Sequence, residues 1–162
     1  SGPAVRPAEL PLQVGPWKVE RELGRGGEGW VYLGIDAAGR RAAVKLHRIA
    51  AAAERERRLL ARLEGPHVAR LVGSGNHEGR AWVATAWIDG TDLDLVVERL
   101  AHRPPAERHA RALTLGRALA DVLVSLHAQG VVHWDLKPAN VRITPEGTPI
   151  LLDFGKIGRA HV

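Results

Sequence analysis

The sequence VVHWDLKPANVRITPEGTPILLDFGK, residues 131–156, decides the fold prediction for this chain. Val141 and Ile143 alternate with polar residues, residues 145–148 have the composition of a tight turn, and residues 150–152 form a short apolar run. This pattern predicts a β-hairpin. Because a hairpin brings its two outer ends together, polar side chains that flank it should meet at one edge.

Residues with useful chemistry flank this predicted hairpin on both sides. Asp135, Lys137 and Asn140 precede the hairpin, and Asp153 follows it. Carboxylate and amide oxygens suit Mg²⁺, and a lysine suits a polyphosphate. The stretch therefore indicates a site for phosphoryl transfer, provided that the earlier chain supplies a phosphate clamp.

A glycine-rich turn near the N-terminus is the candidate clamp. Residues 24–29 read GRGGEG and lie between two predicted strands, so the arrangement is not that of a Rossmann or P-loop site, in which a helix follows the glycines. A glycine-rich hairpin is also explained by an ordinary tight turn. Lys45, on the next predicted strand, favours the phosphate-binding interpretation because it could reach the same phosphates.

The rest of the chain predicts an α+β fold in two parts. Strands are expected at residues 17–23, 30–35, 41–46, 68–72 and 81–86, and helices at 50–63, 93–100 and 106–128. Glu56 lies near the apolar face of the first helix, where it would either face solvent or pair inward. Residues 73–76, GSGN, are interpreted as a turn between two strands, and Gly130 as the glycine that ends the last helix.

The expected organisation is a small antiparallel sheet with one helix over residues 16–86, a hinge at 87–90, and a mainly helical part at 91–162. Residues 1–15 are rich in proline and are interpreted as an extended arm or a segment left over from cloning. Thr91 and Asp92 are expected to cap the helix that follows them.

Composition excludes several classes of protein. The chain has no cysteine, which rules out disulfide frameworks and thiolate metal sites. Its net charge is +5, but the arginines of residues 54–64 are interspersed with glutamates, so we expect no nucleic-acid binding. No apolar run is long enough for a membrane span, and we expect a cytoplasmic protein. The histidines, His47 among them, lack metal-ligand spacing and are interpreted as ordinary surface or core residues.

The motifs GRGGEGWV, AAVK, a helix glutamate, HWDLKPAN and DFG follow one another in this order. Taken together they resemble the eukaryotic-like (Hanks-type) Ser/Thr protein kinases of bacteria, over residues 17 to about 156. The resemblance implies a bilobal kinase-like fold that binds ATP and Mg²⁺, and the Lys-Pro-x-Asn form at 137–140 is similar to the Ser/Thr subclass.

The resemblance also implies roles for individual residues. Those that would bind the nucleotide are Gly24, Gly26 and Gly29 over the phosphates, Val31 and Ala43 around the adenine, Thr85 as gatekeeper, and Ala86 and Ile88 in the hinge. Those that would serve the transfer are Lys45 on the phosphates, Glu56 holding Lys45, Asp135 as proton acceptor, Lys137 on the γ-phosphate, and Asn140 and Asp153 on Mg²⁺.

Several features depart from the family pattern. Trp134 replaces the arginine that pairs with a phosphorylated activation loop, Glu28 stands at the glycine-loop tip, and Arg142 replaces the leucine under the adenine. The stem of Arg142 is expected to cover the base while its head reaches water. Since the chain stops at Val162, soon after the DFG motif, we expect a shortened C-lobe.

Three hypotheses on function follow. The first is an ATP- and Mg²⁺-dependent Ser/Thr kinase. The second is a nucleotide-binding pseudokinase or regulatory module that acts through a partner, and the third is a small-molecule phosphotransferase of kinase-like fold. In each case the shortened C-lobe predicts an oligomer or a chain completed by another polypeptide.

Overall fold

The computed structural model describes residues 10–131 and 137–152. Asp135 and Asp153, two of the predicted site residues, lie outside the described residues, as does Trp134. The chain divides into two compact units, one made of Ser1–Ala61 and Arg70–Trp87, the other of Arg62–Ala69 and Ile88–Val162.

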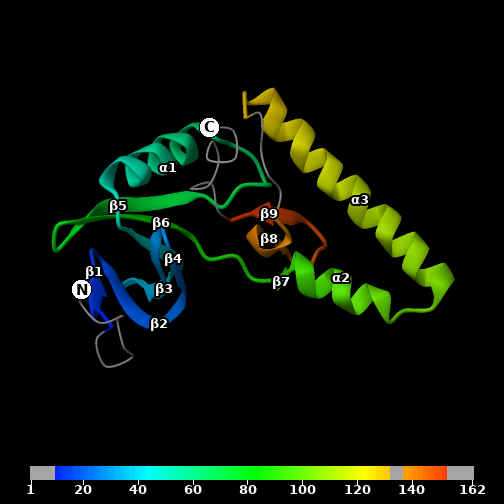
Figure 1. Cartoon of the computed structure of the whole chain (residues 1–162), viewed down its shortest axis with the longest axis horizontal. Coiled ribbons are helices and arrows are strands. Elements are labelled where there is room, and N and C mark those ends of the chain that lie inside the picture. The colour runs from blue at the N-terminus through cyan, green and yellow to red at the C-terminus, as the bar shows by residue number, and fades with distance from the viewer. Residues whose placement is uncertain (1–9, 132–136, 153–162) are drawn as a thin grey trace. The chain divides into compact units, whose positions relative to one another are not determined.

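The first unit is an antiparallel sheet of six strands with one helix (Figure 1). The sheet has the order β1-β2-β3-β4-β6-β5. The elements are β1 (Gln13–Val14), β2 (Trp17–Gly26), β3 (Gly29–Ile35), β4 (Arg41–His47), α1 (Ala50–Arg62), β5 (Leu71–His77) and β6 (Arg80–Ala86). The predicted sheet with a single helix is thus confirmed.

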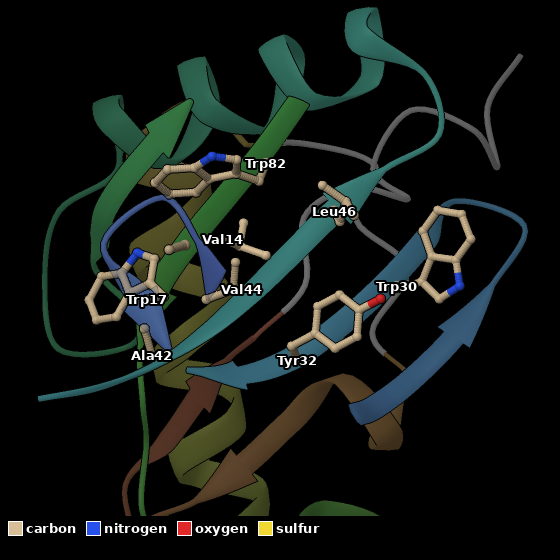
Figure 2. Packing of buried hydrophobic residues seen from close by; sticks show 9 residues of the cluster. Val14, Trp17, Trp30, Tyr32, Ala42, Val44, Leu46 and Trp82 are labelled. Carbon is tan, nitrogen blue, oxygen red and sulfur yellow. The ribbon is translucent and has the colours of Figure 1, made fainter. Parts of the chain in front are cut away.

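One face of this sheet carries an aromatic core. Figure 2 shows the cluster, in which Trp17, Tyr32 and Trp82 pack with small aliphatic side chains such as Val44. Val44 and its neighbours two residues away along β4 belong to this face. Because side chains alternate across a strand, Ala43, Lys45 and His47 point to the opposite face. The core therefore fixes the sheet and leaves its other face to the candidate site residues.

The start of the sheet differs from the expectation of an arm that ends at residue 15. Gln13 and Val14 pair with Lys18 and Trp17 of β2, and Val14 is fully buried in the aromatic core. This part of the predicted arm is therefore a strand of the sheet.

The position of β5 corrects the predicted turn at residues 73–76. These residues lie within β5, and the turn is at Glu78 and Gly79, which both have positive φ. A side chain at Gly75 would press on the indole of Trp82, whose nearest atoms lie 3.0 Å from an added Cβ, whereas at Gly73 the distance of 3.4 Å is the limit of ordinary contact. Gly75 thus leaves room for that ring, which is a reason for glycine inside a strand.

The second unit contains the predicted helices and hairpin. Its elements are β7 (Thr91–Asp92), α2 (Leu93–Ala101), α3 (Pro105–Ala128), the short 3₁₀ helix η2 (Pro138–Asn140), β8 (Val141–Ile143) and β9 (Pro149–Leu151). β8 and β9 pair antiparallel as predicted, with Gly147 in the left-handed region at the turn. Gly130 follows α3 with φ 82°, as expected for a helix-ending glycine. Among the described residues, no helix is both long and apolar enough to cross a bilayer.

Candidate functional site

Lys45 lies between two carboxylates. Its Nζ atom is 3.0 Å from Oε2 of Glu28 and 3.4 Å from Oε2 of Glu56. The exposed fractions of the three side chains are 13% for Lys45, 11% for Glu28 and 5% for Glu56. The ammonium group is therefore held in a largely enclosed place, where charge–charge interactions are much stronger than in water.

Glu56 lies on α1, and its side chain points inward. The periodicity of α1 allowed either a solvated or an inward side chain, and the structure places Glu56 among the buried residues of the helix, with Ala53 and Leu60. The predicted pairing of Lys45 with Glu56 is present. At 3.4 Å, this contact is longer than the 3.0 Å contact of Lys45 with Glu28.

His47 is the site residue that sequence reasoning missed. Its Nε2 lies 3.1 Å from Oε1 of Glu56, and only 1% of its side chain is exposed. A usable signal was its position two residues after Lys45, because residues i and i+2 of a strand point to the same face. The spacing of the histidines in the sequence does not reveal that alternation.

The glycine-rich turn is fastened to the end of β4. The backbone N–H of Arg48 donates to the carbonyl of Glu28 at 2.9 Å, and its Nε donates to the carbonyl of Gly26 at 3.3 Å. The Arg48 guanidinium also lies 4.1 Å from the ring centre of Trp30, a distance typical of a cation–π contact. These contacts orient the loop so that Glu28 reaches Lys45.

The glycines of this turn are not all required for the same reason. No atom lies within 4 Å of a Cβ added at Gly24, Gly26 or Gly27 among the described residues, so packing alone does not explain glycine there. Gly29, in contrast, has φ 144°, and an added Cβ would meet the carbonyl oxygen of Leu46. Open space beside the first three backbones, in a turn whose Glu28 contacts the largely enclosed Lys45, fits a polyphosphate.

The predicted adenine-contacting residues of the first unit share the face of Lys45. Val31 is the partner of Lys45 across β3 and β4, and Ala43 is the partner of Thr85 across β4 and β6. Directly paired residues in a ladder point to the same side of the sheet. The sheet thus collects small and β-branched side chains beside the lysine. Ala86, the next residue, donates its N–H to the Arg70 carbonyl.

The second unit brings the ends of the hairpin together as predicted. The N–H of Leu152 donates to the carbonyl of Asn140 at 2.9 Å, and the N–H of Asn140 donates to the carbonyl of Lys137. Asn140 is half-buried and Lys137 is exposed. This hydrogen bond joins Asn140, one predicted metal ligand, to Leu152, the residue that precedes Asp153 in the sequence. Within the described ranges, no three acidic or histidine side chains gather as a metal site.

Contrary to the prediction, the guanidinium group of Arg142 does not extend into water. Its Nε and Nη2 both lie 3.1 Å from Oδ1 of Asp92, and its Nη1 donates to the carbonyl of Ile88 at 3.0 Å. The side chain is 18% exposed. The same contact explains a second difference, because Asp92 precedes α2 without a side-chain capping bond. A charge-assisted pair with Arg142 takes the place of the predicted cap.

Comparison with known proteins places these features in a family. The model of the protein kinase domain family matches residues 17–161. The Ser/Thr protein kinase AfsK of Streptomyces coelicolor is 34% identical over 90% of this chain, and PknH of Mycobacterium tuberculosis H37Rv is 35% identical over 87%. The chain spans 18% and 23% of the length of those two relatives.

Solved structures agree with the sequence relatives. The crystal structure of the PknI kinase domain of Mycobacterium tuberculosis is 28% identical, with a TM-score of 0.65, and the match covers 88% of this chain and 61% of that one. The order of motifs, the antiparallel sheet with its single helix, and the Lys45–Glu56 pair all fit this likeness. The chain belongs to the protein kinase domain family, among the bacterial Hanks-type Ser/Thr kinases.

Proposed function

We propose that this chain carries the nucleotide-binding and catalytic residues of a Ser/Thr protein kinase that uses ATP and Mg²⁺. The observation that carries the proposal is the ion pair of Lys45 with Glu56, which joins β4 to α1 on the face that also presents Val31 and Ala43. In protein kinases this lysine–glutamate pair must be formed for transfer to occur.

The roles of the residues follow from their chemistry. ATP with Mg²⁺ would supply the phosphoryl group. Lys45 would neutralise phosphate charge and Glu56 would hold its ammonium group in place, while Lys137 would add a second cation. Asp135 would accept the proton of the substrate hydroxyl, and Asn140 and Asp153 would hold the metal.

The fit of ATP to the described residues rests on two observations. The backbones of Gly24 and Gly26 have open space beside them, and Lys45, which Glu28 of the same turn contacts, is mostly enclosed. The fit of Mg²⁺ rests on the hairpin, which brings the amide-bearing Asn140 next to Leu152, the residue before Asp153. An amide and a carboxylate oxygen are suitable ligands for this ion.

A regulatory nucleotide-binding module that acts through a partner is the second candidate. The contact of Glu28 with Lys45 favours it, because that carboxylate holds the ammonium group that would bind phosphate. A transferase acting on a small molecule is separated from the first proposal by its product alone, which would be a phosphorylated metabolite.

The test measures nucleotide binding and transfer in the same preparation. Titration with Mg²⁺–ATP should show saturable binding, and labelled ATP should transfer phosphate to a generic protein substrate. Lys45→Met should abolish both, Asp153→Ala should abolish transfer, and Lys18→Met, at an exposed lysine of β2, should change neither. Binding without transfer above the level of Asp153→Ala would favour the regulatory module, and absence of binding would overturn the proposal.

A further inference from the structure

We propose that His47 is a positioning residue of this site, which fixes the Glu56 carboxylate in the orientation that serves Lys45. The inference rests on the proposed function, since it concerns the geometry in which Lys45 meets phosphate. It assigns a role to a residue outside the motifs that identify the family.

The carboxylate of Glu56 is held from one strand at both of its oxygens. Nε2 of His47 lies 3.1 Å from Oε1, and Nζ of Lys45 lies 3.4 Å from Oε2. Both partners project from the same face of β4 because they are two residues apart. Two fixed contacts on opposite oxygens leave the carboxylate little freedom to rotate about its terminal bond.

The lysine alone is a weak anchor for Glu56. Its contact with Glu56 is the longer one, and its contact with Glu28 is 3.0 Å. When Lys45 shifts toward Glu28 or toward a phosphate, a carboxylate held only by the lysine would lose its orientation. His47 supplies a contact that does not depend on where the ammonium group points.

The chemistry of the contact identifies the nitrogen that matters. An ionised carboxylate only accepts hydrogen bonds, so Nε2 of His47 carries the hydrogen. Nδ1 is buried and has no hydrogen-bond partner among the described residues. Among the residues that the structure describes, Nε2 is therefore the atom through which His47 acts at this site.

Burial shows that packing is a poor explanation for histidine at this position. The side chain is 1% exposed and Glu56 is 5% exposed. A buried polar atom that lacks a partner is destabilising, so an aliphatic residue would fill the same space at lower cost. The polar contact with Glu56 is what histidine offers that leucine does not.

Three substitutions at position 47 separate positioning from packing. His47→Gln places an amide N–H near the place of Nε2, His47→Asn places one near the place of Nδ1, and His47→Leu offers none. We expect the affinity for Mg²⁺–ATP to stay within about threefold for the glutamine variant. The asparagine and leucine variants should lose about tenfold, which corresponds to about 1.4 kcal/mol.

The outcomes are decisive in each direction. Rescue by glutamine but not by asparagine supports the proposal. Wild-type affinity in all three variants would overturn the proposal, because His47 would then have no role in binding. An equal loss of affinity in all three variants would also overturn it, because it would indicate a role in packing. Thermal unfolding of each variant shows that the comparison is made between folded proteins.

A double-mutant cycle keeps this inference separate from the proposed function. If the wild-type chain binds no nucleotide, the kinase proposal fails, and the unfolding of His47→Leu, Glu56→Gln and the double variant still tests the contact. Non-additive effects would support the hold of His47 on Glu56. Additive effects would overturn it.

Discussion

Replacing Glu28 by glutamine should tighten nucleotide binding. The carboxylate of Glu28 lies 3.0 Å from Nζ of Lys45, and both side chains are nearly enclosed. A phosphate oxygen that binds the lysine has to compete with this contact. Glu28→Gln keeps the size and shape of the side chain while it removes the negative charge, so it weakens the competitor and leaves the loop in place.

The size of the effect follows from the kind of hydrogen bond that is changed. Glu28→Gln changes an ion pair into a hydrogen bond in which only the ammonium group of Lys45 is charged, and the attraction between two charges that are not fully buried contributes up to about 1 kcal/mol. A difference of about 1 kcal/mol predicts about fivefold tighter binding of Mg²⁺–ATP. Calorimetric titration of the two proteins under one salt condition measures it directly.

Glu22→Gln is the matched control. Glu22 lies on β2 near the same loop and pairs with Arg25 instead of Lys45. The Glu22→Gln substitution removes the same charge from the same region, and we expect the affinity of this variant for Mg²⁺–ATP to stay near that of the wild type. Unchanged or weaker binding by Glu28→Gln would refute the competition. An equal gain of affinity in both variants would show that the net charge of the region, and not the contact of Glu28 with Lys45, controls binding.

Three further perturbations test the frame around the site. Gly29→Ala should destabilise the protein by about 1–3 kcal/mol, because the residue has positive φ and its added Cβ would meet the carbonyl of Leu46. Gly26→Ala is the control: its added Cβ would meet open space, so this variant should unfold at the same denaturant concentration as the wild type. Arg142→Leu removes the hydrogen bonds to Asp92 and to the carbonyl of Ile88 and should destabilise the chain by about 1–3 kcal/mol in denaturant unfolding; a stability equal to that of the wild type would show that these bonds contribute no net stability. Arginine side chains on α1 lower the pKa of Glu54 from its usual 4.5 to about 2, so the ionised form stabilises the fold. That contribution is present above pH 4.5 and is lost as the pH falls toward 2, so the difference in melting temperature between wild type and Glu54→Gln should shrink over that range; a constant difference would contradict it.

Local patterns in the sequence predicted the hairpin and the helices because short-range physics controls them. Val141 and Ile143 alternate with polar residues, and Gly147 supplies the positive φ of the turn, so neighbouring residues suffice to define the β8–β9 pair. The same holds for Gly130 at the end of α3. These features needed no knowledge of the rest of the chain.

The errors arose where a distant side chain decides the local structure. Gly73 and Gly75 have the composition of a turn, and their pairing with Ala84 and Trp82 of β6 places them within β5. Asp92 has the position of a helix cap, and Arg142, fifty residues away, takes its carboxylate. Neither partner can be identified from a short window of sequence.

The candidate site shows the same division. The motifs predicted which residue types would gather around Lys45, because each motif is local. Two further residues take part in the site: Glu28 contacts Lys45, and His47 contacts Glu56. They lie at the glycine-loop tip and at the end of β4, which only the fold brings together. The sequence shows Glu28 at the glycine-loop tip, and only the fold shows its contact with the lysine.

The fastening of the glycine loop by Arg48 has a consequence for the entropy of binding. Ordering the backbone of one residue costs about 1–2 kcal/mol, and a loop that closes over a ligand from a mobile state meets this cost when the ligand binds. In this chain Gly26 and Glu28 are already tied to β4, so folding has ordered them. Affinity for a ligand under this loop should therefore depend on the stability of the sheet, and a substitution that loosens Arg48 would weaken binding without touching any atom of the ligand.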